Sequence, residues 1–232
     1  MDTTQEIKHQ EIEQDFLHYI GSDTPLILKG GTALLFCYGL DRFSEDLDFD
    51  AEHQGYSSLK TIHDFATSYG YTYSEKKNTP TVQRATIDYG GYKPLKIETS
   101  LRQRAVNPSR TTVINGIHVY TIEQLAIMKA NAYLGRDKIR DLYDLSYIVT
   151  TAWDKLPDAT QDQIREALAN KGLGQFDYLL TTNNDPLINT DQLIDRFLAA
   201  NDIAGLITDE FAPHQEAPQY ACSRGDQNQS HL

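Results

Sequence analysis

The fold is decided by residues 26–50, which read LILKGGTALLFCYGLDRFSEDLDFD. Residues 26–28 are apolar and predict a short buried strand. The run Lys29-Gly30-Gly31-Thr32 follows at once, and residues 33–38 predict a helix that ends at the next glycine. The stretch therefore places a glycine turn between a strand and the start of a helix.

The glycine turn has the properties of a phosphate-binding element. Without side chains at Gly30 and Gly31, backbone N–H groups and the Thr32 hydroxyl can approach a phosphate at the helix N-terminus. The turn is not a P-loop, because no Gly-Lys-Ser/Thr follows, and the chain has no Gly-x-Gly-x-x-Gly. An ordinary tight turn is the alternative.

The acidic residues at the end of the stretch predict a metal site. In a strand, Asp46 and Asp48 point to the same face, because side chains repeat every two residues. Two neighbouring carboxylates suit Mg²⁺, which takes oxygen ligands and completes its shell with water and phosphate oxygens. An EF-hand is excluded, because Ala51 stands where glycine is required and Ser57 where the bidentate glutamate is required.

Outside this stretch, the chain changes character near Thr121. The first part is predicted to contain helices at 5–20 and 59–69, strands at 71–75, 82–89, 94–100 and 112–120, and a hairpin turn at Asn115-Gly116. The second part is predicted to be helical at 121–134, 138–150, 159–169 and 190–200. We expect an α+β fold, a mixed sheet flanked by helices, over residues 1–120. A helical domain that completes the site would span 121–213, and a polar, disordered tail 214–232.

Composition excludes several classes of protein. The 232 residues carry 21 Lys+Arg against 33 Asp+Glu, a formal charge of −12. No apolar stretch approaches the roughly 20 residues of a membrane span, and the polar N-terminus is unlike a secretory signal. We therefore expect a cytoplasmic protein that makes no use of a membrane. Two cysteines, Cys37 and Cys222, exclude a disulfide framework or a Cys-rich zinc site.

Three motifs in order along the chain resemble those of the AbiEii-type nucleotidyltransferase toxins. This family includes the MenT toxins and belongs to the DNA polymerase β-like nucleotidyltransferase superfamily. The motifs are Lys29-Gly-Gly-Thr-Ala-Leu with Arg42-Phe-Ser-Glu-Asp-Leu-Asp-Phe; Lys96-Ile-Glu-Thr-Ser100; and Ile127-Met-Lys129 followed by Arg136 and Arg140-Asp-Leu-Tyr-Asp144-Leu. The resemblance covers residues 10 to 150 and implies a nucleotidyltransferase-fold sheet.

The resemblance implies transfer of a nucleoside monophosphate (NMP) from a nucleoside triphosphate (NTP), with pyrophosphate leaving. Asp46, Asp48 and Glu98 would hold Mg²⁺, and Glu98 is also a candidate to take the proton of the attacking hydroxyl. Lys129 and Asp141 are implied as a further catalytic pair. An exposed Lys96–Glu98 ion pair is the alternative for the middle motif.

The same resemblance implies a nucleotide-binding set beyond the carboxylates. Its members are Lys29, Gly30, Gly31, Thr32, Arg42, Ser44, Lys129, Arg140 and Asp144. Lys129 lies in a run that reads as buried, so we expect an anion near it, such as a phosphate. The alternatives are a turn role for Ser44 and a surface salt bridge between Arg140 and Asp144. Tyr133 and Tyr143 are candidates to stack on a base or to fill the core.

The acceptor implied by the resemblance is RNA, with the tRNA 3′ end favoured. Modification there would block translation, as expected of the toxin in a type IV toxin–antitoxin, abortive-infection pair with a cognate antitoxin. Residues 51–110 carry 9 basic and 5 acidic residues, and we expect RNA to contact Lys93, Lys96, Arg102, Arg104 and Arg110. The alternative is an ordinary solvated basic face that binds no RNA. A small-molecule acceptor such as an antibiotic, or a non-catalytic nucleotide-binding module, are the alternative functions.

Overall fold

The computed structural model describes residues 3–53, 55–91, 93–103, 105–182 and 185–207. Its centre is a mixed seven-stranded sheet with strand order β3-β4-β5-β2-β1-β7-β6. The strands are β1 (Leu26–Lys29), β2 (Asp46–Ala51), β3 (Thr72–Asn78), β4 (Val82–Asp88), β5 (Leu95–Ser100), β6 (Thr111–Ile114) and β7 (Ile117–Tyr120). The expected tail, 214–232, lies outside the described residues.

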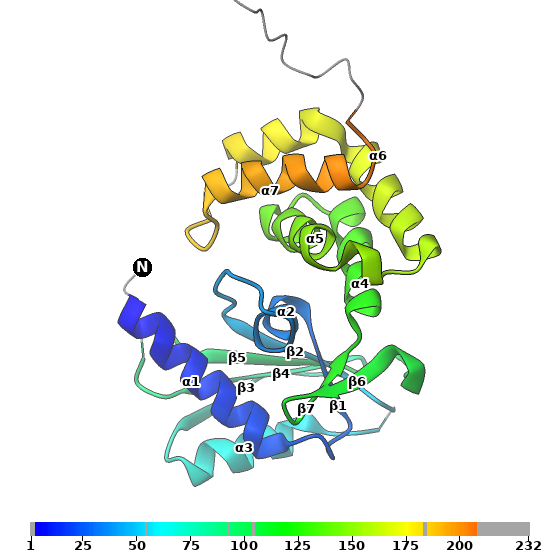
Figure 1. Cartoon of the computed structure of the whole chain (residues 1–232). Coiled ribbons are helices and arrows are strands. Elements are labelled where there is room, and N and C mark those ends of the chain that lie inside the picture. Colours follow the sequence, from blue (N-terminus) through cyan, green and yellow to red (C-terminus); the bar gives the residue numbers. More distant parts are fainter. Residues whose placement is uncertain (1–2, 54, 92, 104, 183–184, 208–232) are drawn as a thin grey trace, which may run out of the picture.

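The helices are numbered in the order in which they occur along the chain (Figure 1). They are α1 (Thr3–Ile20), α2 (Gly30–Tyr38), α3 (Ser58–Ser68), α4 (Ile122–Gly135), α5 (Ile139–Ala152), α6 (Asp158–Thr182) and α7 (Thr190–Ile203), with 3₁₀ turns at Pro108–Arg110 and Trp153–Lys155. Figure 1 shows α2 between the sheet and the C-terminal helices. The α+β class and the helical C-terminal region are confirmed.

Strand β2 lies in the middle of the sheet and sets its two faces. It pairs antiparallel with β1 and parallel with β5. Leu47 and Phe49 are buried on one face, where Phe49 packs near Phe16 of α1, and Phe16 in turn meets Phe65 of α3. By the two-residue period of a strand, Asp46, Asp48 and Asp50 point to the opposite face, the side of α2.

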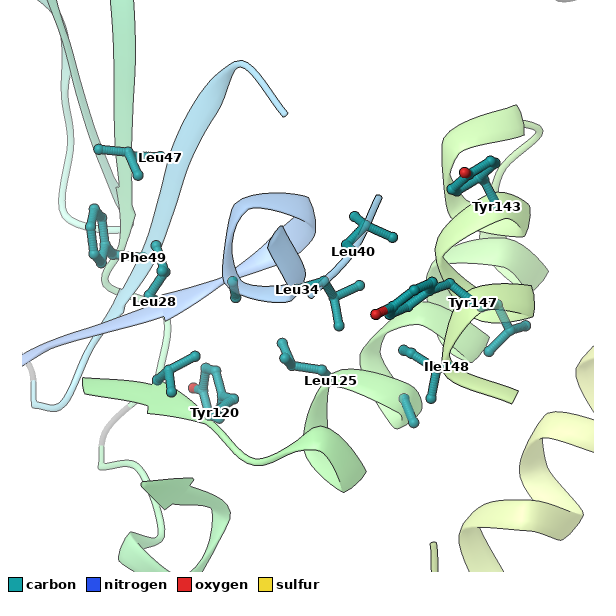
Figure 2. Packing of buried hydrophobic residues seen from close by; sticks show 14 of the residues in the cluster. Leu28, Leu34, Leu40, Leu47, Phe49, Tyr120, Leu125, Tyr143, Tyr147 and Ile148 are labelled. Atoms are coloured by element: carbon teal, nitrogen blue, oxygen red, sulfur yellow. The ribbon is translucent and has the colours of Figure 1, made fainter. Parts of the chain in front are cut away.

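The hydrophobic core runs without a break from the sheet into the helical region. Figure 2 shows Leu34 and Leu40 between Leu28 of the sheet and the α5 residues Tyr147 and Ile148. Helix α4 begins at Ile122, directly after β7, close to the boundary expected at Thr121. The division of the chain at residue 120 stays a prediction, because the buried cluster includes residues from both sides of it.

Most predicted elements are confirmed within a few residues, including the hairpin at Asn115-Gly116, where both residues have positive φ. The exception is α6, which continues to Thr182 beyond a break at Gly172 (φ 60°, ψ −174°). Beyond the break, Phe176 stacks on Phe197 of α7 with ring centroids 4.0 Å apart. Tertiary packing thus orders a segment whose glycines argue against helix. None of the helices in the described ranges is long and apolar enough to cross a membrane.

Candidate active site

The β2 carboxylates lie beside the middle motif of the sequence. In the parallel register of β2 and β5, Asp46 is opposite Lys96 and Asp48 is opposite Glu98. The predicted acids of two distant motifs therefore share one face of the sheet. Burial raises the pKa of Asp48, and repulsion from Asp46 adds to this, while Lys96 opposes it. A cation near Asp48 would relieve this cost.

The glycine turn sits against Asp48. Helix α2 begins at Gly30, whose φ is 80°, and a Cβ placed there would lie 3.4 Å from Asp48 Oδ2. At Gly31 a Cβ would meet Arg42 Nη2 at 2.7 Å and Ser44 Oγ at 2.8 Å, so a side chain has no room. The Thr32 hydroxyl donates to the Asp46 carbonyl at 2.5 Å and lies 2.9 Å from the Ser44 hydroxyl. Thr32 and Ser44 are buried and brace the turn against β2.

A pocket of about 400 Å³ opens between this turn and helix α4. Its lining combines cationic, acidic and apolar side chains: Lys29, Gly30, Asp48, Asp50, Ser100, Arg102, Gln103, Leu125, Met128, Lys129, Ala132, Arg136 and Asp141. Cations and the free amides of a helix start suit phosphates, and an apolar wall suits a base. The pocket has the mixed chemistry of a nucleotide site.

A buried ion cluster lies behind the pocket. Asp144 is fully buried, accepts from Arg42 through both oxygens at 2.7 Å, and is 2.5 Å from Lys129 Nζ. Burial opposes ionisation of Asp144, but Lys129 and Arg42 outweigh it and hold the pKa below its usual value. The sequence predicts an anion near Lys129, and in the structure the carboxylate of Asp144 is such an anion. Arg42 and Asp144 line no part of the pocket, so they support it from below.

Lys129 and Asp141 face the pocket together. Lys129 Nζ is 3.5 Å from Asp141 Oδ1, and Arg136 grips Asp141 through Nε at 2.6 Å and Nη2 at 3.0 Å. Two cations of the third motif, Lys129 and Arg136, thus line the same pocket as Lys29, Gly30 and Asp48 of the first motif. Arg136, part of that motif but absent from the predicted site, belongs here. Tyr133 and Tyr143 are buried, which confirms the core alternative for both.

Three predicted residues, Lys96, Glu98 and Arg140, are held in other ion pairs. Lys96 binds Asp46 at 2.5 Å and Arg84 binds Glu98 at 2.5 Å, so the Lys96–Glu98 pair considered from the sequence does not form. Arg140 pairs with Asp185, and at 3.4 Å with Glu45, and not with Asp144. Arg140 therefore faces away from the pocket toward the loop before α7, which gives its predicted nucleotide contact no support.

The donor chemistry of β2 fits the predicted Mg²⁺. Asp46 and Asp48 offer hard oxygens on one face, and Asp48 has no ion-pair partner within the described part of the chain. No group of three or more His, Cys, Asp or Glu that could hold a metal ion occurs among the described residues. Lys96 binds one oxygen of Asp46 and Arg84 binds one oxygen of Glu98, so Asp48 is the member of the predicted set without an ion-pair partner among the described residues.

The predicted RNA-binding residues that the structure describes have different surroundings. Lys93 is paired with Glu45 at 2.6 Å near the start of β5, Arg102 lines the pocket beyond its end, and Arg110 is exposed next to β6. Lys96 is engaged with Asp46. Arg104 lies outside the described residues. The four described positions are spread along the length of β5 and beyond.

Besides Arg136, sequence reasoning missed Asp50 and Gln103, which line the pocket, and Tyr120, which contacts Asp50. Asp50 is buried and is bound by Lys29, Tyr120 and Gln103. Asp50 could have been predicted from the sequence, because it continues the alternation of acids in Asp46-x-Asp48-x-Asp50. Gln103 and Tyr120 come from a loop and from β7, and no local pattern connects them to β2.

Comparison with known proteins finds nucleotidyltransferases among the solved structures of similar fold. The chain resembles the crystal structure of JHP933 from Helicobacter pylori with 27% identity and a TM-score of 0.73, covering 87% of this chain and 91% of that one. A putative nucleotidyltransferase from H. pylori gives the same identity and TM-score, covering 87% and 94%. The nucleotidyltransferase toxin MenT4 from Mycobacterium tuberculosis has 16% identity and a TM-score of 0.50, covering 86% and 84%, which shows a shared fold. No curated protein matches the chain.

A family model covers the region that carries these motifs and the helices behind them. The model described as "Nucleotidyl transferase AbiEii toxin, Type IV TA system" matches residues 17–217. This span includes β2, the glycine turn, Glu98 and the α4–α5 cluster. The chain belongs to the AbiEii family of nucleotidyltransferase toxins.

Proposed function

We propose that the protein transfers an NMP from an NTP to an RNA acceptor, with the tRNA 3′ end as the favoured target. The observation that carries the proposal is the placement of Asp46 and Asp48 on one strand face, directly against the glycine turn of Gly30. Phosphates held at this turn would meet the carboxylates. A pocket of about 400 Å³ with an apolar wall adjoins them.

Binding of the triphosphate is assigned to the turn and the pocket cations. Amides at the start of α2 and the ammonium groups of Lys29 and Lys129 would contact phosphate oxygens. Asp141 would position the Lys129 ammonium, and Arg136 fixes Asp141 through two hydrogen bonds. Thr32, Ser44, Arg42 and Asp144 keep these groups in place from the interior. Mg²⁺ held by Asp46 and Asp48 would neutralise charge on the triphosphate and its leaving group.

In the reaction, the acceptor hydroxyl oxygen forms a bond to the α-phosphorus, and the bond to the β-phosphate oxygen breaks, releasing pyrophosphate. Glu98 is the proposed acceptor of the hydroxyl proton. Both Arg84 contacts go to Glu98 Oε2, so Oε1 remains for that proton. Lys93, Lys96, Arg102, Arg104 and Arg110 stay as proposed RNA contacts, to be tested singly.

The family of toxins in type IV toxin–antitoxin systems supports a cognate antitoxin as partner. Blocked aminoacylation of modified tRNA would halt translation and could serve phage defence. NTP and tRNA are cytoplasmic, so we place the activity in the cytoplasm. A decayed, non-catalytic module is disfavoured because Asp46 and Asp48 of β2 and Glu98 of β5 lie on neighbouring strands, and Asp48 shares the pocket wall with Lys129.

The test is incubation of the protein with total tRNA, Mg²⁺ and each α-labelled NTP in turn. We expect label on tRNA with at least one NTP and none with Asp48→Ala. Asp64→Asn, on the exposed face of α3, is the matched control and should label as wild type does. Label found on a small molecule from an extract, and never on RNA, would replace the RNA acceptor with a small one.

A further inference from the structure

Asp50 is the third acid on the active-site face of β2, and its contacts differ from those of Asp46 and Asp48. Only 2% of the residue is exposed. Oδ1 accepts from Lys29 Nζ at 2.5 Å, and Oδ2 accepts from Tyr120 Oη at 2.8 Å and from Gln103 Nε2 at 3.2 Å. Both oxygens are therefore engaged by protein donors.

The ring of donors around Asp50 is itself connected. Gln103 Nε2 lies 3.3 Å from Tyr120 Oη, so the two donors to Oδ2 also contact each other. Tyr120 is almost fully buried, and Figure 2 shows it within the packed core beside Leu125. Burial raises the pKa of the Tyr120 hydroxyl, and the Asp50 charge adds to this. Tyr120 is thus held as a neutral donor, which suits an anionic Asp50.

Lys29 is the one partner of Asp50 whose charge reaches the pocket. It ends β1 and immediately precedes Gly30, and a quarter of its side chain is exposed. An ammonium group has three donors, and Asp50 takes one. No other partner of the Lys29 ammonium is found within the described ranges, so two of its donors remain, and Lys29 lines the pocket.

Lysine carries a flexible four-carbon stem, and a phosphate-binding ammonium loses affinity when that stem is free to move. Both oxygens of Asp50 accept from protein donors, and the contact with Oδ1 fixes Lys29 Nζ beside the glycine turn. We infer that Asp50 is a positioning residue that aims the Lys29 ammonium at the NTP phosphates, with Tyr120 and Gln103 fixing Asp50 in turn. The inference rests on the proposed nucleotide site and adds a residue to it.

The test is a double-mutant cycle on NTP binding, which needs no acceptor. Calorimetry would measure the Kd of non-hydrolysable α,β-methylene analogues of ATP, GTP, CTP and UTP, each with Mg²⁺. We expect Lys29→Met and Asp50→Asn each to weaken binding of the preferred analogue by about tenfold. The double variant should bind no more weakly than Lys29→Met alone, because Asp50 acts through Lys29.

Two further variants keep the test sharp. Tyr120→Phe leaves the ion pair but removes a donor to Asp50, and should weaken binding by a smaller factor, with no effect in the Lys29→Met background. The exposed pair Lys60 and Asp64 on α3 is the matched control, and Lys60→Met with Asp64→Asn should leave the Kd unchanged. Circular dichroism at the assay temperature would check folding, and if Asp50→Asn does not fold, the Tyr120→Phe cycle decides.

Three outcomes overturn the inference. One is wild-type Kd in both Asp50→Asn and Tyr120→Phe. In the second, the double variant weakens binding by the product of the two single effects on Kd, which would show that Asp50 acts independently of Lys29. In the third, wild-type protein binds none of the four analogues, and the proposed function falls together with the inference; in the first two, binding by wild type leaves the proposed function standing.

Discussion

Arg42 and Asp144 form a bidentate ion pair, with both N···O distances 2.7 Å, across 102 positions of sequence. Both side chains are buried. The pair joins the loop before the Asp46–Asp48 strand to helix α5, and Lys129 of α4 contacts the same carboxylate. The loop that leads into β2 and the Lys129 side of the pocket are thus both tied to one buried acid.

This relationship predicts a strong effect of Asp144 on stability. Asp144→Ala leaves the buried Arg42 without its anion and removes the nearer of the two carboxylates at Lys129, so the free energy of unfolding should fall by roughly 3–5 kcal/mol. Urea denaturation followed by circular dichroism measures the change. Asp64→Asn, which breaks an exposed pair with Lys60, should have little effect. Equal effects of the two substitutions would contradict the role of the buried cluster.

The close approach at Gly31 predicts a difference between two glycine-to-alanine substitutions. In Gly31→Ala the new methyl group would press on Arg42 Nη2 and Ser44 Oγ, so activity should fall by at least about tenfold as the turn shifts. At Gly174 of α6 a Cβ meets nothing within 4 Å, and Gly174→Ala should retain activity and gain up to ~1 kcal/mol of stability. Transferase assays and thermal denaturation of both proteins provide the comparison.

The β2 carboxylates predict a loss of catalysis without a loss of fold. Asp46→Asn or Asp48→Asn should reduce the transfer rate by roughly 100-fold or more, since several kcal/mol of charge stabilisation would be lost. The circular dichroism spectrum should stay as in wild type. Rates within a few fold of wild type in a folded variant would show that the two acids are not the metal site.

Buried Glu13 predicts a pH-dependent stability. Neither of its side-chain oxygens has a hydrogen-bond partner among the described residues. Burial raises its pKa well above the usual value, and the Asp46 charge adds to this. The folded state therefore holds a proton that the unfolded state releases, and stability falls as pH rises from the unfolded pKa toward the raised one.

Glu13→Gln removes this titration. The variant should be more stable than wild type above the raised pKa, and near wild type at about pH 4.5, close to the ordinary pKa of the residue. Denaturation curves at acidic, neutral and alkaline pH measure the difference. A stability gap that is constant across this range would contradict the assignment of a buried, protonated Glu13.

The local parts of the fold and site were predictable from short-range patterns. The turn at Gly30 and Gly31, the alternation of Asp46 and Asp48, and the hairpin at Asn115-Gly116 each depend on two to four adjacent residues. Such signals are fixed by the backbone and do not need the tertiary structure. The order of helices in the second half follows from helical periodicity in the same way.

The ion pairing was not predictable, because partners come from distant elements. Arg140 pairs with Asp185 and not with the neighbouring Asp144, which is taken by Arg42 from the other half of the chain. Lys96 turns to Asp46 on the adjacent strand. A one-dimensional pattern names charged residues, but the sheet order and helix packing decide which charges meet.

The most direct test of the central claim compares α-labelled with γ-labelled NTP in the presence of tRNA and Mg²⁺. Nucleotidyl transfer predicts that the α label appears on the tRNA while the γ label leaves entirely as pyrophosphate. In Asp48→Asn neither label should move. Appearance of the γ label on tRNA or on the protein, without the α label, would contradict the account and show phosphoryl transfer instead.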